Sequence, residues 1–293
     1  MPATAILKRI PKGARSAAAN LLQDLITKVL ENRTSSLAWS RLFGFASSCF
    51  ATPPRGGRSR NLTTLINRQI DAYSSGSSVT SSQSSQQPGA LQSSRQLRSR
   101  TTAGEPSEKP EAIAKRASIK LEDGDVRGAI RILSSSDTIA PRDATTAAAL
   151  GALHPSTPPD RRPPPTTTSA PMHVNSSAVK KAISSFPNGS AGGPDGLRPQ
   201  HLKDLLIGAK DDHPLLMKIT ELMNLVIEGL TPCHVLPILF GGSLTAITKK
   251  SGGIRPIAVG YLWRRLSGKL VCNHAAARMA ALLSPRQLGF AVK

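Results

Sequence analysis

Leu244-Thr-Ala-Ile-Thr-Lys-Lys-Ser-Gly-Gly-Ile-Arg-Pro-Ile-Ala-Val-Gly260 is the stretch that decides the fold of the last third of this 293-residue chain. Two short apolar runs flank Ser251-Gly-Gly253, which predicts two strands joined by a turn. Proline cannot donate to a strand ladder, so at Pro256 the second strand should begin, lie at a sheet edge, or face something other than a partner strand. Around the bend lie three cations that could bind phosphate: Lys249, Lys250 and Arg255.

Three further motifs lie on either side of this hairpin. Arg264-Arg-Leu266 and Pro285-Arg-Gln-Leu-Gly-Phe290 follow it, and Gly192-Gly-Pro-Asp-Gly-Leu197, with His201-Leu202 after it, precedes it. In this order the four motifs resemble the fingers region of reverse transcriptases encoded by non-LTR retrotransposons. The resemblance covers roughly the last third of the chain, and four motifs in order are more specific than any one of them. A looser similarity extends to residues 120–133 and 10–15.

The resemblance implies roles for particular residues. Lys249, Lys250 and Arg255 match the cations that hold the triphosphate of the incoming nucleotide and the template backbone, and Gln287 matches a residue that lies against the template strand. The alternative is an ordinary surface hairpin with lysines that protect its edge.

The helix expected after the hairpin carries a second group of cations, Arg264, Arg265 and Lys269. Arg265 and Lys269 share a helix face at i, i+4, where two like charges repel unless an anion lies between them. We therefore expect this group to contact template or primer backbone; the alternative is a solvated helix face.

Catalytic carboxylates are missing from the sequence. Polymerases that the chain resembles hold magnesium ions with aspartates in two later motifs, but here the last Asp is Asp212 and the last acidic residue is Glu228. A two-metal site needs anionic oxygen ligands. We therefore expect a truncated polymerase that is inactive alone, with no cofactor in this part and Mg²⁺ required only by the intact enzyme. Asp195 is expected to bond its own backbone in a turn rather than a metal.

Composition limits the partners and the compartment. Residues 1–104 contain 14 Lys and Arg but 3 Asp and Glu. This balance favours binding to nucleic acid through counterion release; the alternative is a solvated basic tail.

The three cysteines lie far apart, and neither Cys233-His234 nor Cys272-x-His274 has the spacing of a zinc site. This pattern favours a reducing intracellular compartment, nucleus or cytoplasm. No apolar run approaches the roughly 20 residues that span a bilayer, so no membrane partner is expected. A mitochondrial transit peptide is the minor alternative for the start of the chain.

We predict a mostly α fold with disordered linkers and a partial α/β part at the carboxyl end, built from the fingers hairpin and helices. Periodicity and helix-stop residues predict helices over 13–32, 37–50, 61–73, 214–229 and 262–283, and a helix pair around Gly124-Asp125. The predicted segments are a basic helical region (1–73), a disordered Ser/Gln/Arg linker (74–105), a helical hairpin region (106–153), a Pro/Thr-rich linker (154–174) and a partial reverse transcriptase domain (175–293).

Three functions follow as hypotheses. The first is a fragment of an RNA-directed DNA polymerase that retains the nucleotide- and template-contacting fingers. The second is a basic nucleic-acid-binding protein derived from a retroelement, whose Arg-rich amino half would bind RNA even after deletion of residues 243–293. The third is a helical interaction module without affinity for nucleic acid.

Overall fold

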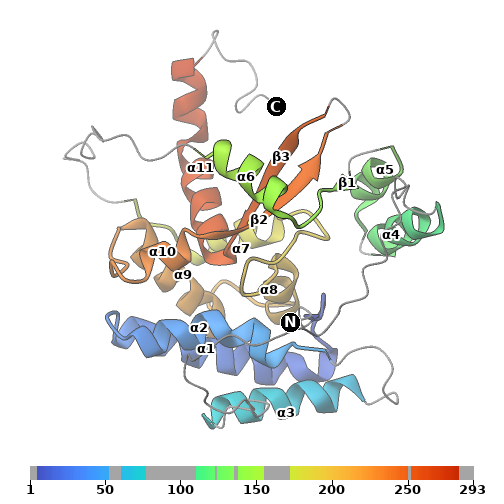
Figure 1. The fold of residues 1–293 in the computed structure, drawn as a ribbon. Helices are drawn as coiled ribbons and strands as arrows, with labels where there is room; N and C mark the ends of the chain where they lie inside the picture. Colours follow the sequence, from blue (N-terminus) through green and yellow to red (C-terminus); the bar gives the residue numbers. More distant parts are fainter. Residues whose placement is uncertain are drawn as a thin grey trace, which may run out of the picture.

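The computed structural model describes residues 5–52, 61–76, 110–122, 124–134, 138–154, 172–249 and 252–283. Within these ranges the protein is mostly helical, with one small antiparallel sheet (Figure 1). None of the described helices is long and apolar enough to cross a lipid bilayer. The two predicted linkers lie outside the described residues except at their ends. The elements are η1 Lys12–Ala14, α1 Arg15–Glu31, α2 Ser36–Cys49, α3 Leu62–Ser74, α4 Pro110–Glu122, α5 Val126–Ser134, β1 Thr138–Ile139, α6 Ala144–Ala152, α7 Ser176–Ser184, α8 Pro199–Leu205, α9 Pro214–Ile227, α10 Leu236–Leu239, β2 Gly242–Thr248, β3 Ile254–Gly260 and α11 Leu262–Leu283.

The predicted helices form where periodicity and breakers place them. Asn61 caps α3 by accepting from the Thr63 backbone N–H at 3.0 Å, as expected. Pro199 occupies the first turn of α8, and Gly229, with φ +74°, follows the end of α9. The four-residue helix α10 was not predicted, because Pro232 and Pro237 suggested only a connection.

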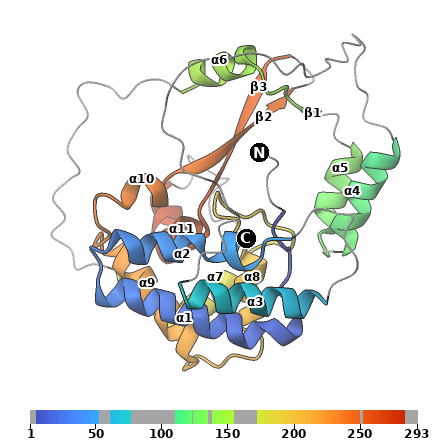
Figure 2. The ribbon, with the colours of Figure 1, turned by 60° about the horizontal axis from the view of Figure 1, so that its bottom comes forward.

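One hydrophobic core joins the amino-terminal helices to those after residue 172. Helix α1 packs against α2, α3, α8 and α9, while α7 and α9 both contact α11 (Figure 2). Fully buried side chains come from both parts of the chain: Leu22, Leu25, Ile26, Phe45, Leu215, Ile219, Trp263 and Leu266. Burying a side chain of this size stabilises the fold by about 1.5 to 3 kcal/mol. The amino-terminal helices therefore form one wall of the core against which the predicted fingers helices pack.

Two buried polar residues of α8 fix the segment that leads into α1. The Asp204 carboxylate accepts the Ile10 backbone N–H at 2.9 Å and lies 3.4 Å from the Arg15 guanidinium. His201 Nε2 lies 2.7 Å from the Leu7 carbonyl oxygen, and its Nδ1 accepts the Arg198 backbone N–H at 3.2 Å. His201 follows the Gly192–Leu197 motif, so a residue that contributes to the resemblance here holds the amino-terminal segment.

This arrangement requires a neutral His201, because one ring nitrogen must accept while the other donates. Burial lowers the pKa of His201 to about 4 from the ordinary 6.5. Between these values the unfolded chain binds a proton that the folded chain does not, so acidification from pH 6.5 to pH 4 lowers the free energy of unfolding. The slope approaches about 1.4 kcal/mol per pH unit in the middle of the window.

Replacing His201 by glutamine is expected to remove this acid-dependent loss. The measurement is the free energy of unfolding in urea at several pH values between 4 and 7, compared with the parent protein. Buried Asp195 changes the free energy of unfolding in the opposite direction. Its pKa is raised to about 6, so the folded chain binds a proton more tightly than the unfolded chain, and this stabilisation is lost as pH rises. The Asp195→Asn variant should therefore lose stability more steeply on acidification, and an identical pH profile for parent and His201→Gln would contradict this assignment.

The sheet has the order β1-β2-β3, and all pairs are antiparallel. Pro256, on β3, lies opposite Ala246 on β2. Strand β3 is an edge strand, as the presence of Pro256 predicts. The two-residue strand β1 pairs Ile139 with Ile247 and was not predicted. Helix α6 contacts β3. The segment predicted as a helical hairpin region therefore splits, because its second half joins the sheet.

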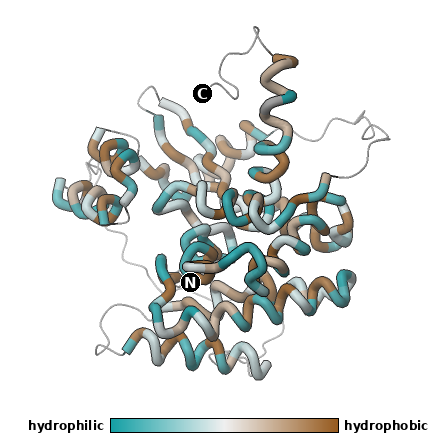
Figure 3. Tube along the Cα trace, turned by 180° about the vertical axis from the view of Figure 1, so that it is seen from behind, coloured by the Kyte–Doolittle hydropathy of each residue, from teal (hydrophilic) through white to brown (hydrophobic). Residues whose placement is uncertain are grey.

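The first half of that segment forms the predicted helix pair, α4 and α5, around a turn at Gly124 (φ +72°). Asp125 accepts the Gly128 backbone N–H at 2.9 Å and pairs with Lys120 at 2.9 Å, and these hydrogen bonds lower the pKa of its carboxyl group. Figure 3 shows this pair at the side of the molecule, with hydrophobic positions along it. Four of its apolar side chains are about half or more exposed: Leu121, Val126, Ile130 and Leu133.

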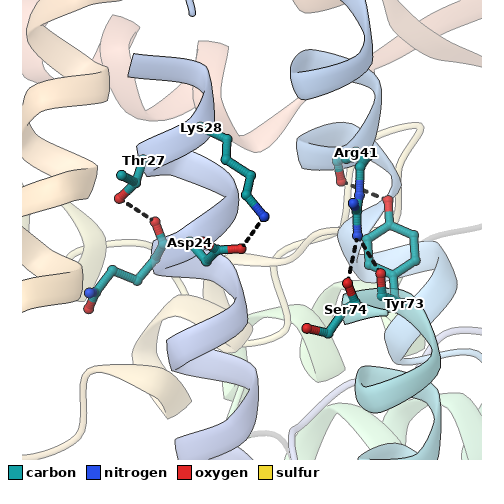
Figure 4. A network of polar contacts seen from close by, with 7 residues as sticks. Asp24, Thr27, Lys28, Arg41, Tyr73 and Ser74 are labelled. Atoms are coloured by element: carbon teal, nitrogen blue, oxygen red, sulfur yellow. Dashed lines mark hydrogen bonds and ion pairs between the residues drawn. The ribbon is translucent and has the colours of Figure 1, made fainter. Parts of the chain in front are cut away.

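Helices α2 and α3 are joined by a reciprocal contact (Figure 4). The Arg41 guanidinium donates to the Tyr73 carbonyl oxygen and lies 5.3 Å from the centre of the Tyr73 ring, whose hydroxyl donates to the Arg41 carbonyl oxygen at 2.8 Å. Gly44 is required beside this ring, because a Cβ there would lie 2.6 Å from the Tyr73 hydroxyl oxygen. The contact fixes α3 on the outer side of the bundle.

Candidate nucleic-acid interface

Two of the predicted cations, Lys249 and Arg255, lie near the tip of the hairpin. The Lys249 backbone N–H donates to the Gly253 carbonyl oxygen at 3.1 Å, and the Lys249 carbonyl oxygen accepts from Gly252 at 3.1 Å. Gly252 and Gly253 both have φ +79°, a conformation that favours glycine, so the Gly-Gly pair sets the bend. Lys249, directly after β2, and Arg255, on β3, are both exposed beside it. Lys250 and Gln287 lie outside the described residues.

The two arginines at the base of the hairpin hold backbone carbonyl groups. Arg264 donates from Nη1 to the Phe240 carbonyl oxygen at 3.1 Å, and its guanidinium lies 5.8 Å from the centre of the Phe240 ring. Arg265 donates from Nη1 to the Ala191 carbonyl oxygen at 2.6 Å, and burial lowers its pKa. Both arginines therefore have structural partners that the sequence did not predict.

Three cationic side chains lie close to Phe186, just beyond the end of α7. The Arg265 guanidinium and the Lys269 ammonium lie 5.4 Å and 5.1 Å from the centre of its ring. The Lys203 ammonium donates to its carbonyl oxygen at 2.6 Å. The negative face of an aromatic ring and the carboxyl end of a helix both attract cations. The Arg265–Lys269 pair, for which we expected an intervening anion, thus has an aromatic ring close to both members.

The Gly192–Leu197 loop forms the predicted turn. Asp195 Oδ1 accepts the Leu197 backbone N–H at 3.2 Å, and the Gly196 N–H donates to the Gly193 carbonyl oxygen at 2.9 Å. Asp195 Oδ2 is buried without a hydrogen-bond partner among the described residues, and desolvation raises the pKa of this carboxyl group to about 6. The turn role expected for Asp195 is confirmed.

This loop lies against the junction of β3 and α11. A Cβ on Gly193 would stand 2.8 Å from the Tyr261 Cα and 2.9 Å from the Gly260 carbonyl oxygen, so only glycine permits the approach. Arg265 ties α11 to Ala191, immediately before the loop. The Gly192–Leu197 motif, remote in sequence, therefore meets two motifs that are neighbours in sequence, the hairpin and Arg264–Leu266, at the base of the hairpin.

The predicted cations fall into two groups. Lys249 and Arg255 lie near the tip, while Arg264, Arg265 and Lys269 lie on α11 beyond the base. At about 3.3 Å per residue, the part of β3 from Arg255 to Gly260 separates the groups by roughly 15 Å or more. The sequence predicted two groups with different roles, nucleotide contact near the bend and strand contact on the following helix, and the structure places the two groups on separate surfaces.

A groove between α7 and α11 contains one of the predicted cations and three basic residues that the sequence did not single out. Its volume is about 650 Å³, and segment 172–175 closes its side. Lys181 and Lys269 line it, together with His173 and His274. No carboxylate of the described residues lines it; Glu228 approaches only the outer rim, 3.9 Å from His173 Nδ1. In the sequence, the feature that comes nearest to indicating this basic groove is the absence of acidic residues after Glu228. That feature does not identify Lys181, which precedes Glu228 in the chain.

The Mg²⁺ implied by the resemblance does not fit the residues around the hairpin. No acidic residue follows Glu228 in the sequence, and the buried Asp195 bonds its own turn. Among the residues that the structure describes, no group of three or more His, Cys, Asp or Glu side chains could hold a metal ion. We assign no metal-dependent step to these residues.

Comparison of the chain with known protein families, with curated protein sequences and with solved structures finds no match.

Proposed function

We propose that this chain supplies the amino-terminal and fingers parts of a non-LTR retrotransposon reverse transcriptase, an RNA-directed DNA polymerase, and that it binds nucleic acid with them. The observation that carries the proposal is the meeting of the Gly192–Leu197 loop, the base of the hairpin and the start of α11. Motifs that resemble one family in sequence would be scattered if the resemblance were accidental. In the described residues the Gly192–Leu197 motif instead lies beside the base of the hairpin and the start of α11, which supports the proposal.

The hairpin has a geometry suited to anions. Its two strands are paired along their full length, from Gly242–Gly260 to Thr248–Ile254, so the backbone near the tip is already ordered. Ordered cations bind a phosphate group at a lower entropic cost than cations on a free loop. Lys249 offers a point charge, while Arg255 can donate two parallel hydrogen bonds to phosphate oxygens.

The proposal predicts that the Lys249→Ala/Arg255→Ala double variant binds single-stranded RNA more weakly than the parent chain. Each phosphate contact that is lost lowers the slope of log K against log salt by about 0.7, so the double variant should lose about 1.4. The measurement is fluorescence anisotropy of a labelled RNA of about 20 nucleotides over about 50 to 300 mM salt.

A matched control removes the same charge elsewhere. Lys180 and Lys210 are outside the hairpin and the groove, and Lys180 pairs with exposed Asp211 at 3.3 Å. The Lys180→Ala/Lys210→Ala variant should keep the parent slope. If the hairpin variant and this control bind RNA alike, the hairpin is not the interface.

The alternative, a basic protein that binds through its Arg-rich amino half, makes the opposite prediction for the same variant: parent-like affinity. Deletion of residues 243–293 cannot separate the two hypotheses cleanly. That deletion removes Leu262, Trp263 and Leu266 from the core, so loss of binding would report unfolding. Point substitutions at exposed cations avoid this.

A further inference from the structure

We propose that the groove between α7 and α11 binds the phosphate backbone of one strand of nucleic acid, with Lys181 and Lys269 contacting phosphates. The inference rests on the proposed function and adds to it a second contact surface, beyond the base of the hairpin. It also assigns a role to Lys181, a residue of α7 outside every motif of the resemblance.

The walls of the groove are fixed before any ligand binds. The side-chain amide of buried Asn224 pairs with the backbone of Val174, accepting its N–H at 2.9 Å and donating to its carbonyl oxygen at 3.0 Å. This holds the segment that carries His173 and Asn175 beside α7. On the other two sides, Val179 and Leu270 are buried in the core and anchor α7 and α11. Because the backbone of the walls is already fixed, binding adds only the cost of ordering the side chains.

The two lysines of the groove have no carboxylate partner among the described residues, whereas His173 lies 3.9 Å from Glu228. No ion pair within the described part of the chain involves Lys181 or Lys269, and Lys269 lies instead over the Phe186 ring. Lys180, the neighbour of Lys181 on α7, does have a carboxylate partner in Asp211. Unpaired cations in a concavity focus a positive potential, which attracts a polyanion.

The remaining lining favours a strand rather than a small anion. A volume of about 650 Å³ is in the range of pockets that enclose ligands much larger than phosphate. The polar side chains Asn175 and Asn273 line it together with apolar Val174 and Leu270, which offers hydrogen bonds and contact area to a sugar or a base beside the phosphates. A positively charged groove can follow the backbone of a single strand without reading its sequence.

The test is the Lys181→Ala/Lys269→Ala variant of the full chain, with the same labelled single-stranded RNA. We expect affinity to fall by about tenfold or more at low salt, and the salt slope to fall by about 1.4. Lys180→Ala/Lys210→Ala is the matched control, because it removes the same number of lysines but none from the groove. Thermal unfolding of each variant checks that the fold is intact.

Each outcome decides between the proposals. A loss in the groove variant alone supports the inference. Equal losses in the groove variant and the control overturn it in favour of attraction by overall charge. No loss in the groove variant, with a loss in Lys249→Ala/Arg255→Ala, overturns the inference and leaves the proposed function standing. Absence of salt-dependent RNA binding by the parent chain overturns both.

Discussion

Replacing Asp204 by alanine is expected to lower the free energy of unfolding by about 3 to 5 kcal/mol, because it removes the acceptor that fixes the amino-terminal segment. The side chain of Asp204 is 2 % exposed, and the Arg15 guanidinium lies 3.4 Å away. Without the carboxylate, the Ile10 N–H and the Arg15 charge lose their partner in a buried place. Urea unfolding at pH 7, followed by circular dichroism, measures the effect.

Two further variants separate the causes. Asp204→Asn keeps an oxygen that can accept from Ile10 but removes the charge, so it should cost less than Asp204→Ala. Asp24→Ala is the matched control: Asp24 pairs with Lys28 at 2.7 Å on one exposed helix face (Figure 4), where such pairs contribute about 0.5 kcal/mol or less. A cost for Asp204→Ala as small as that of Asp24→Ala would show that the segment is held by apolar packing alone.

The second large effect is expected at Gly196, where replacement by alanine should lower the free energy of unfolding by about 3 kcal/mol. Its φ of +77° costs an L-residue roughly 1 to 2 kcal/mol. The new Cβ would also stand 1.9 Å from the Ile6 Cδ1, so Ile6 must move, at a cost of about 1 to 3 kcal/mol for overpacking. The free energy of unfolding in urea is again the measurement.

Gly208→Ala isolates the backbone contribution, because Gly208 has φ +72° and its added Cβ would meet no atom of the described residues within 4 Å. It should cost about 1 kcal/mol. A double-mutant cycle with Ile6→Ala then tests the contact: Gly196→Ala should cost about as much as Gly208→Ala once Ile6 is shortened. If Gly196→Ala costs the same in both backgrounds, the amino-terminal segment does not press on this loop.

The secondary structure of the described residues follows closely from local sequence signals. Helix α11 begins at the predicted Leu262, and its stripe of Leu262, Leu266 and Leu270 is buried. The hairpin forms at its Gly-Gly turn with Pro256 on an edge strand. These features depend on side-chain spacing and on glycine and proline conformations, which neighbouring residues determine. Strand β1 was not predicted, because a strand of two residues is too short to show an alternation of apolar and polar side chains.

The candidate site was predictable only in part. Motif order located Lys249, Arg255, Arg264, Arg265 and Lys269, but not which of them share a surface. Their division into a tip group and a group on α11 follows from the length of β3, and the position of α7 beside α11 places Lys269 alone of them in the groove. The carbonyl partners of Arg264 and Arg265 could not be read from the sequence either, since each lies in a segment remote from its arginine.

The sequence by itself determined where the long helices and the two hairpin strands lie, the basic balance of the chain, and the absence of Asp and Glu after Glu228. Only the tertiary structure decided that α1, α2 and α3 share one core with α7, α8, α9 and α11, that α8 holds the amino-terminal segment, and that Lys181 and Lys269 face one groove. The reason is physical. An apolar stripe gains free energy from burial against any matching surface, so its sequence specifies that it is buried but not what covers it.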